Sequence, residues 1–218
     1  MKIAIDGPAG AGKSTAAKAV AAALHMGYLD TGAMYRAAAY AFLSHGVDVN
    51  DHEKVLAGLP KLDVGVEYEG GKQINLVDGS DVNPYIRTPE VSKGASDVAV
   101  IPAVRLKLVE LQRQVAEQYD IVMDGRDIGT YVLPDADYKF FITASPAVRA
   151  QRRYLEICGT RPDVTVEQIE REIIARDKTD SSREFAPLRQ AEDAVLVDTS
   201  NLGIEEVVAL LLSAIKAK

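Results

Sequence analysis

The 218-residue chain has little of what several classes of protein require. Its one cysteine, Cys158, excludes an intramolecular disulfide and is typical of proteins from a reducing compartment. No run of about eighteen apolar residues occurs, and Asp6 interrupts the N-terminal stretch where a signal peptide would carry its apolar core. We therefore expect a cytoplasmic protein that is neither secreted nor inserted into a membrane.

The chain also has no excess of basic over acidic residues. The chain carries 25 Lys and Arg against 32 Asp and Glu, a net charge of −7, which argues against unspecific binding to nucleic acid or anionic membranes. The three histidines, His25, His45 and His52, lack metal-ligand spacing, and no zinc site or catalytic triad is recognisable. With 47% hydrophobic and 26% charged residues, the composition is that of an ordinary globular domain, which we expect to span residues 1–218.

A glycine-rich motif is present near the start of the chain. Residues 7–14 read G-x-x-x-x-G-K-S, between a short apolar stretch typical of a buried strand and a run of strong helix formers. In such a loop the backbone N–H groups face phosphate oxygens at a helix N-terminus, the lysine reaches the β- and γ-phosphates, and the serine hydroxyl can ligate Mg²⁺. We therefore predict a nucleotide-binding site, with Ser14 as a ligand of Mg²⁺, made by Gly7, Pro8, Ala9, Gly10, Ala11, Gly12, Lys13, Ser14 and Thr15.

The rest of the chain alternates apolar, strand-like stretches with helical patterns. This alternation predicts an α/β fold of the P-loop NTPase type: a doubly wound, mostly parallel sheet of about five strands with helices on both faces. Between about 62 and 87 the pattern changes to period-2 alternation around Gly70-Gly71, which predicts an antiparallel insertion. A hairpin at the edge of the main sheet would give the same pattern. The expected strands of the main sheet are 2–6, 27–30, 120–124, 138–143 and 194–198.

A helical lid is expected at about 149–165. Arg149, Arg152 and Arg153 share one face of a helix that ends in a Gly- and Pro-containing loop. We predict that Arg152, Arg153 and Arg161 close over the γ-phosphate, although solvated surface charges would look the same. A capping box at Thr165–Gln168 begins the following helix, whose Ile169, Ile173 and Ile174 are expected to point inward.

A P-loop alone does not distinguish kinases, GTPase switches and motor ATPases. The guanine-reading pattern N-K-x-D has its nearest counterpart at residues 177–180, which begin with Asp and close an amphipathic helix. Asp124 ends an apolar strand as a Walker-B-like acid and is predicted to orient a water bound to Mg²⁺. A small-molecule kinase is favoured, and a regulatory nucleotide-binding switch stays an alternative.

Several segments resemble the signature segments of bacterial cytidylate kinases. They are DTGAMYR (30–36), IRTPEV (86–91), DGRDIGT (124–130), RDKTDSSR (176–183) and APL (186–188), and the resemblance covers essentially the whole chain. It implies ATP-dependent phosphorylation of CMP and dCMP by a monomer, with a nucleoside-monophosphate-binding segment at about 30–105 that includes the β insertion. The acceptors UMP, AMP and shikimate remain alternatives.

The resemblance also implies roles for individual residues. Arg36, Arg126 and Arg183 would hold the acceptor phosphate, Tyr35, Arg176 and Asp180 would face the ribose, and Ser96, Arg105 and Asp127 would read cytosine. The 4-amino group of cytosine is a donor suited to a carboxylate, whereas uracil presents an acceptor there. Thr31, where the family often has Ser, keeps the hydroxyl of the acceptor-binding segment. At the position of Ser14 some relatives have Gly, so direct ligation of Mg²⁺ there varies within the family.

Overall fold

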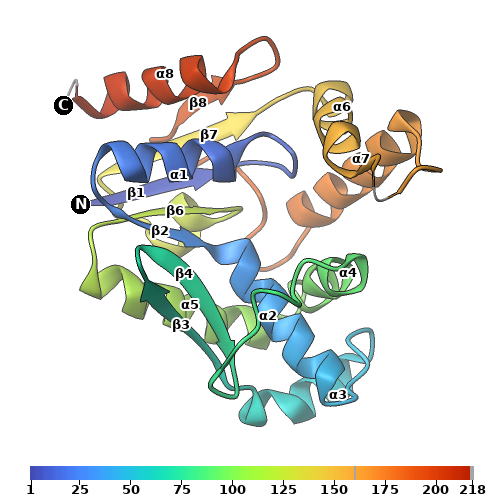
Figure 1. The fold of residues 1–218 in the computed structure, drawn as a ribbon. Helices are drawn as coiled ribbons and strands as arrows, with labels where there is room; N and C mark the ends of the chain where they lie inside the picture. Colours follow the sequence, from blue (N-terminus) through green and yellow to red (C-terminus); the bar gives the residue numbers. More distant parts are fainter. Residues whose placement is uncertain (160, 217–218) are drawn as a thin grey trace. The chain divides into compact units, whose positions relative to one another are not determined.

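The computed structural model describes residues 1–159 and 161–216 (Figure 1). These residues pack as two compact units. The first combines Met1–Met26 with Ile121–Lys218, and the second is Gly27–Asp120. The glycine-rich loop and the segment predicted to be a lid belong to the first unit, whereas the predicted antiparallel insertion belongs to the second.

A parallel sheet forms the centre of the first unit, with strand order β6-β1-β7-β8. The central strand β1 is buried from Ile3 to Asp6, as expected of a parallel strand with neighbours on both edges. Its register places Asp6 beside Gly125 of β6 and Phe141 of β7, so the loop that follows β1 starts where those strands end. The elements of this unit are β1 (Lys2–Asp6), α1 (Lys13–Ala23), β6 (Ile121–Gly125), the π-helical segment η2 (Ile128–Val132), β7 (Tyr138–Thr143), α6 (Pro146–Ile157), α7 (Val166–Ser181), β8 (Val195–Asp198) and α8 (Ile204–Lys216).

The helices α6 and α7 pack on each other over a small apolar cluster that includes Ala150, Val164, Ile169 and Ile173. The capping box predicted at Thr165 is present, with both reciprocal hydrogen bonds to Gln168. Residue 160, inside the predicted lid, lies outside the described residues.

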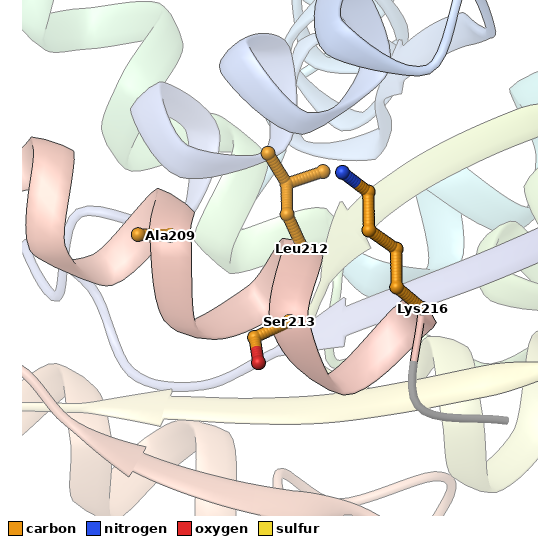
Figure 2. Close-up of a pocket in the computed structure, with 4 residues that line it drawn as sticks. All are labelled: Ala209, Leu212, Ser213 and Lys216. Atoms are coloured by element: carbon orange, nitrogen blue, oxygen red, sulfur yellow. The ribbon is translucent and has the colours of Figure 1, made fainter.

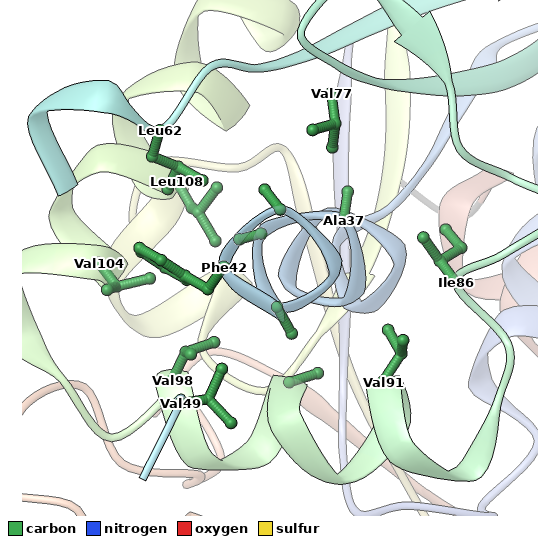
Figure 3. Close-up of a cluster of buried hydrophobic side chains, with 14 of the residues drawn as sticks. Ala37, Phe42, Val49, Leu62, Val77, Ile86, Val91, Val98, Val104 and Leu108 are labelled. Atoms are coloured by element: carbon green, nitrogen blue, oxygen red, sulfur yellow. The ribbon is translucent and has the colours of Figure 1, made fainter. Parts of the chain in front are cut away.

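The second unit is built around the helix α2, which is rich in alanine. Its apolar core packs side chains of α2, such as Phe42, against side chains from α4, α5 and the antiparallel sheet, among them Val98, Leu108 and Val77 (Figure 3). Small residues let the helices approach closely: a Cβ placed on Gly94 of α4 would lie 3.4 Å from the Ala39 Cβ of α2. The elements of this unit are β2 (Gly27–Asp30), α2 (Thr31–Ser44), α3 (His52–Gly58), the 3₁₀ turn η1 (Leu59–Lys61), β3 (Val64–Glu69), β4 (Lys72–Val77), β5 (Ser80–Asp81), α4 (Pro89–Val98) and α5 (Pro102–Gln118).

The predicted α/β class and the antiparallel insertion are confirmed. Counting β2, the described chain has five strands outside the small β3-β4-β5 sheet. That sheet has one strand more than the predicted hairpin, because β5 has only two residues and is too short to show a period. In the described part of the chain, no helix combines the length and apolar character needed to cross a membrane.

One prediction about the core is wrong. Ile174 was expected to point inward with Ile169 and Ile173, yet it is 49% exposed. Ile169 and Ile173 are four positions apart and share one narrow stripe of α7, which faces α6. Ile174 follows Ile173 directly, so the turn of the helix carries it out of that stripe.

Candidate active site

The glycine-rich loop joins β1 to α1 and has the backbone that phosphate binding requires. Gly7, Gly10 and Gly12 have φ angles of 145°, 75° and 88°, which side chains rarely permit. Gly12 is the N-cap of α1, and no side chain caps that helix. The N–H groups of the first turn are therefore available to an anion, at the end of the helix where the dipole favours negative charge.

Gly7 and Gly12 differ in the space around them, which gives a testable contrast. A Cβ on Gly7 would lie 1.9 Å from the main-chain oxygen of Ile142, whereas one on Gly12 would meet nothing within 4 Å. We expect Gly7→Ala to lower the free energy of unfolding by at least about 2 kcal/mol, because backbone would have to move. Gly12→Ala carries only the cost of a left-handed alanine, about 1 kcal/mol. Urea unfolding of both variants measures the difference, and equal losses would contradict the steric explanation.

Lys13 lies inside the loop and is 5% exposed. Its Nζ donates a hydrogen bond of 2.7 Å to the main-chain oxygen of Pro8, so the side chain crosses the loop. Burial lowers the pKa of Lys13, and the nearby positive charge of Arg126 lowers it further, while Asp124 and Asp6 oppose the shift. Binding of an anion would stabilise the protonated form of this lysine, because phosphate charge would compensate the buried ammonium.

The two residues predicted to hold Mg²⁺ are in contact. Ser14 donates a hydrogen bond of 2.8 Å from its Oγ to Oδ2 of the buried Asp124. Among residues 1–159 and 161–216, no group of three or more His, Cys, Asp and Glu side chains could hold a metal by itself. Mg²⁺ at phosphate-transfer sites typically uses one or two carboxylates, waters and substrate phosphates, and a Ser–Asp pair beside the loop fits that mode.

Asp6 fixes the segment that follows β6. Its two carboxylate oxygens accept hydrogen bonds from the N–H groups of Ile128 and Gly129, at 2.8 and 2.7 Å. Burial raises the pKa of Asp6 to about 7, although these two hydrogen bonds and Lys13 favour the ionised form. Asp127, buried and immediately before η2, raises the same pKa by repulsion. The carboxylate of Asp6 therefore orients the turn that carries the predicted cytosine reader.

A second cluster joins β6 to the end of α7. Asp180, 1% exposed, accepts a hydrogen bond of 2.8 Å from Nε of Arg126 and another from Arg183. Burial alone would raise the pKa of Asp180, but Arg126 and Arg183 outweigh it and hold the pKa below its usual value. Arg176 of α7 is exposed and adds to the positive field at Asp180 and Lys13. One carboxylate thus gathers two of the three arginines predicted to hold the acceptor phosphate.

The arginines of the predicted lid lie in contrasting surroundings. Arg149 is buried and donates to Asp177, to the main-chain oxygen of Ala144 and to that of Ala9 in the glycine-rich loop. Arg152 donates to both the hydroxyl and the main-chain oxygen of Thr199. The other two pair with glutamates at the surface: Arg153 with Glu156 at 2.8 Å, and Arg161 with Glu172 at 3.9 Å.

In the second unit, Arg36 is held at the start of α2. Its guanidinium donates to Oδ2 of Asp30 at 3.0 Å, while Oδ1 of Asp30 accepts from the N–H of Ala33 and caps the helix. Within the described residues, the buried Nε of Arg36 makes no hydrogen bond. The predicted residue Thr31 is buried in the first turn of the same helix.

The other predicted residues of this unit come from three helices: Tyr35 from α2, Ser96 from α4 and Arg105 from α5. Arg105 is 1% exposed, donates to the main-chain oxygen of Ala99, and lies with its guanidinium carbon 5.5 Å from the ring centre of Tyr35. Ser96 is half-buried on α4, three residues before Ala99. The packing of Arg105 against Tyr35 is a cation–π contact that the spacing of the two residues does not reveal.

A pocket elsewhere in the first unit is lined by Ala209, Leu212, Ser213 and Lys216 (Figure 2). All four belong to α8, and none of them is a predicted site residue. Its lining supplies one ammonium and one hydroxyl, with no loop or helix N-terminus to hold phosphate. The candidate active site is therefore the glycine-rich loop with the residues that surround it.

A family model described as cytidylate kinase matches residues 3–217. The chain belongs to the cytidylate kinase family. It is 50% identical over 212 residues to the cytidylate kinase of Caldicellulosiruptor saccharolyticus, covering 97% of this chain and 94% of the relative. It is 48% identical over 218 residues to that of Desulfitobacterium hafniense, covering 100% and 94%.

Solved structures agree in fold at much lower identity. An uncharacterised protein from Eubacterium ventriosum aligns with a TM-score of 0.56 and 12% identity, over 100% of this chain and 99% of that one. A gluconokinase from Sinorhizobium meliloti 1021 aligns with a TM-score of 0.51 and 14% identity, over 99% and 91%. These likenesses concern the fold alone and agree with the α/β architecture.

Three residues that hold the surroundings of predicted site residues were not predicted: Asp6 and Arg149 in the first unit and, in the second unit, Gln73, which hydrogen-bonds to the main chain of Asp30 beside Thr31. Asp6 had a visible signal, because a carboxylate at the end of a buried strand needs hydrogen-bond partners. Gln73 shares a face of β4 with Asn75 and Val77, and polar side chains on an inward face are also a signal. Arg149 had none, since it looks like its exposed neighbour Arg153 in the sequence.

Proposed function

We propose that this enzyme transfers the γ-phosphoryl group of ATP to CMP or dCMP, giving ADP and CDP or dCDP. The observation that carries the proposal is the family match over residues 3–217. The backbone of the glycine-rich loop and the buried Lys13 support ATP as the donor. The monomeric state is proposed from the family resemblance alone. A cytoplasmic location, and no binding to nucleic acid or membrane, are proposed from the single cysteine and the net charge of −7.

On the donor side, the loop would hold the β- and γ-phosphates with its N–H groups and with Nζ of Lys13. The 2.7 Å hydrogen bond from Lys13 to Pro8 would then give way to phosphate oxygens, which compensate the buried charge better than a carbonyl does. Ser14 and Asp124 would hold Mg²⁺, Asp124 through a bound water. The ion supplies charge neutralisation on the phosphates.

On the acceptor side, Arg36, Arg126 and Arg183 would bind the phosphate of CMP and bring one of its oxygens into line with the γ-phosphorus. That oxygen forms the new P–O bond while the bond from the γ-phosphorus to the bridging β–γ oxygen breaks, and ADP leaves with the electron pair. The acceptor oxygen is already anionic at neutral pH, so no strong general base is needed. Catalysis then consists of positioning and charge stabilisation.

The remaining site residues divide between recognition and closure. Thr31 and Tyr35, with Arg176 and Asp180, would face the phosphate and ribose side of the acceptor, and Ser96, Arg105 and Asp127 would read cytosine. Arg152, Arg153 and Arg161 would close over the γ-phosphate and exclude water, which prevents hydrolysis of ATP. For Arg152 this closure would exchange its two hydrogen bonds to Thr199 for phosphate oxygens.

A coupled assay of ADP release tests the proposal with CMP, dCMP, UMP and AMP as separate acceptors. We expect strong stimulation by CMP and dCMP and weak stimulation by UMP and AMP. Equal stimulation by AMP, or none by CMP and dCMP, would refute the assignment of the acceptor. ATP turnover that ignores every acceptor would instead favour a regulatory switch.

The base-reading role is tested by Asp127→Ala. Losing the carboxylate removes the acceptor for the 4-amino group of cytosine, so the ratio of kcat/KM for CMP to that for UMP should fall by about 10- to 100-fold. The KM for ATP should change little. Asp135→Ala, an exposed aspartate eight residues further on, is the control. If the preference for CMP survives in Asp127→Ala, Asp127 does not read the base.

A further inference from the structure

Besides its apolar contacts with α2, the antiparallel insertion holds the residue that caps this helix, Asp30, through the side chain of Gln73 of β4. Its Oε1 accepts a hydrogen bond of 2.7 Å from the N–H of Asp30, and its Nε2 donates one of 3.2 Å to the main-chain oxygen of Asp30. Gln73 thus pairs with both main-chain groups of one residue, as a neighbouring strand would. A main-chain N–H can only donate and a carbonyl can only accept, so the orientation of this amide is fixed by its partner.

Two asparagines hold Gln73 in that orientation. Nε2 of Gln73 also donates to Oδ1 of Asn75 at 2.9 Å, and Nδ2 of Asn75 donates to Oδ1 of Asn83 at 2.7 Å. Nδ2 of Asn83 in turn donates to the main-chain oxygen of Gln73 at 2.9 Å, so the three residues form a closed hydrogen-bond network. Asn75 is 2% exposed, so these amides are satisfied by one another rather than by water. We call Gln73, Asn75 and Asn83 the amide ladder.

The residue that the amide ladder holds, Asp30, has two tasks at the start of α2. One carboxylate oxygen caps the helix at the N–H of Ala33, and the other accepts from Arg36 at 3.0 Å. The space between these groups is tight, since a Cβ on Gly32 would lie 3.1 Å from Oδ1 of Asp30 and 3.3 Å from NH1 of Arg36. A small rotation of the Asp30 backbone would therefore move the guanidinium of Arg36 as well.

We propose that Gln73 is a positioning residue for the acceptor phosphate: the amide ladder fixes the backbone of Asp30, and Asp30 directs Arg36. This rests on the proposed function, in which Arg36 binds the phosphate of CMP. It gives the β insertion a task in catalysis, because the insertion supplies all three amides. Gln73 itself does not touch the substrate.

The test compares Gln73→Met, which keeps the length of the side chain and removes both hydrogen bonds to Asp30, with Lys72→Met on the same strand. Lys72 is exposed and serves as the matched control. We expect Gln73→Met to raise the KM for CMP about 10-fold, the effect of one or two lost hydrogen bonds, and to leave the KM for ATP within about twofold. A KM for CMP equal to that of Lys72→Met would overturn the proposal.

A double-mutant cycle separates positioning from a general structural effect. If Gln73 acts through Arg36, adding Gln73→Met to Arg36→Met should leave the KM for CMP within about twofold of Arg36→Met alone. The same increase in both backgrounds would mean that Gln73 does not act through Arg36. If Gln73→Met fails to fold, Asn83→Ala replaces it in the same cycle and removes the last amide of the ladder.

The same assays distinguish this inference from the proposed function. Wild-type enzyme that releases no ADP with CMP would refute the function, and the role of Gln73 in acceptor binding with it. Wild-type enzyme that turns over CMP, together with an unchanged Gln73→Met, would refute only the role of Gln73.

Discussion

Replacing Lys13 with methionine is expected to lower kcat by about 1000-fold, the scale on which removal of a preorganised donor acts on a transition state. Lys13 is the one lysine of the glycine-rich loop, and its Nζ lies inside that loop beside the main-chain oxygen of Pro8. In the proposed reaction it would neutralise charge on the β- and γ-phosphates as the bond between them breaks. Methionine fills the same space without the charge.

The same substitution should leave the protein folded. Lys13 is 5% exposed, and burial lowers its pKa, so the folded state carries an ammonium in surroundings that disfavour it. Removing that charge relieves a desolvation cost, whereas the carbonyl of Pro8 loses its donor. These two effects oppose each other, and we expect the free energy of unfolding to change by no more than about 1 kcal/mol.

Steady-state kinetics and urea unfolding of Lys13→Met measure both effects, and Lys18→Met, an exposed lysine on α1, is the control. Calorimetric titration with CMP should give a dissociation constant close to that of the wild-type enzyme, because Lys13 is proposed to hold the donor. A variant that keeps more than a tenth of the wild-type kcat would show that Lys13 does not stabilise the transferring group.

The parts of this site that the sequence predicted are those whose partners are close in the chain. The phosphate-binding backbone of residues 7–14 depends only on the glycines of this loop and on the helix that follows it. The capping box at Thr165 reaches Gln168, only three residues further along the chain. Backbone geometry fixes such contacts, so residue type and spacing are sufficient to predict them.

The parts that were missed depend on contacts between distant residues. Arg149 donates to the main-chain oxygen of Ala9, 140 positions away, and Gln73 pairs with Asp30 across 43 positions. In the sequence Arg149 shares a helical face with Arg152 and Arg153, and only the packing of α6 on α7 separates the buried arginine from the exposed one. The spacing of residues within one helix therefore does not show which of its arginines is buried.

Arg105 illustrates the difference between a role implied by family resemblance and a role derived from the sequence. Its position beside the apolar stripe of α5 is equally compatible with an exposed charge. Its burial at 1% exposure depends on Ala99 at the end of α4 and on Tyr35 in α2. Those partners are brought together by the apolar core of the second unit, which a single helical pattern does not describe.

Asp180→Asn is expected to lower the free energy of unfolding by about 3 kcal/mol, because it leaves two arginines beside each other without their shared carboxylate. Asp180 is 1% exposed and accepts hydrogen bonds from both Arg126 and Arg183. Asparagine has nearly the same shape, so the loss is electrostatic rather than steric. The KM for CMP should rise as well, since both arginines are proposed to hold its phosphate.

The dependence of this loss on pH identifies the carboxylate as its cause. Burial disfavours the ionised form, but Arg126 and Arg183 hold the pKa of Asp180 below its value in the unfolded chain, about 3.9. A carboxylate with a lowered pKa contributes its full stability above the unfolded value, and that contribution disappears as the pH falls through the folded value. The difference in stability between wild type and Asp180→Asn should therefore be largest near pH 7 and should shrink as the pH falls below about 4.

Urea unfolding at a series of pH values provides the test, with Glu184→Gln as the control. Glu184 is an exposed carboxylate that follows Arg183 directly, so its removal changes the net charge equally without touching the cluster. A double-mutant cycle with Arg126→Met should show strong coupling, because removing one of the two arginines relieves part of the repulsion that Asp180→Asn creates. A loss of stability that is independent of pH, or additive with Arg126→Met, would mean that Asp180 acts through packing and not through its charge.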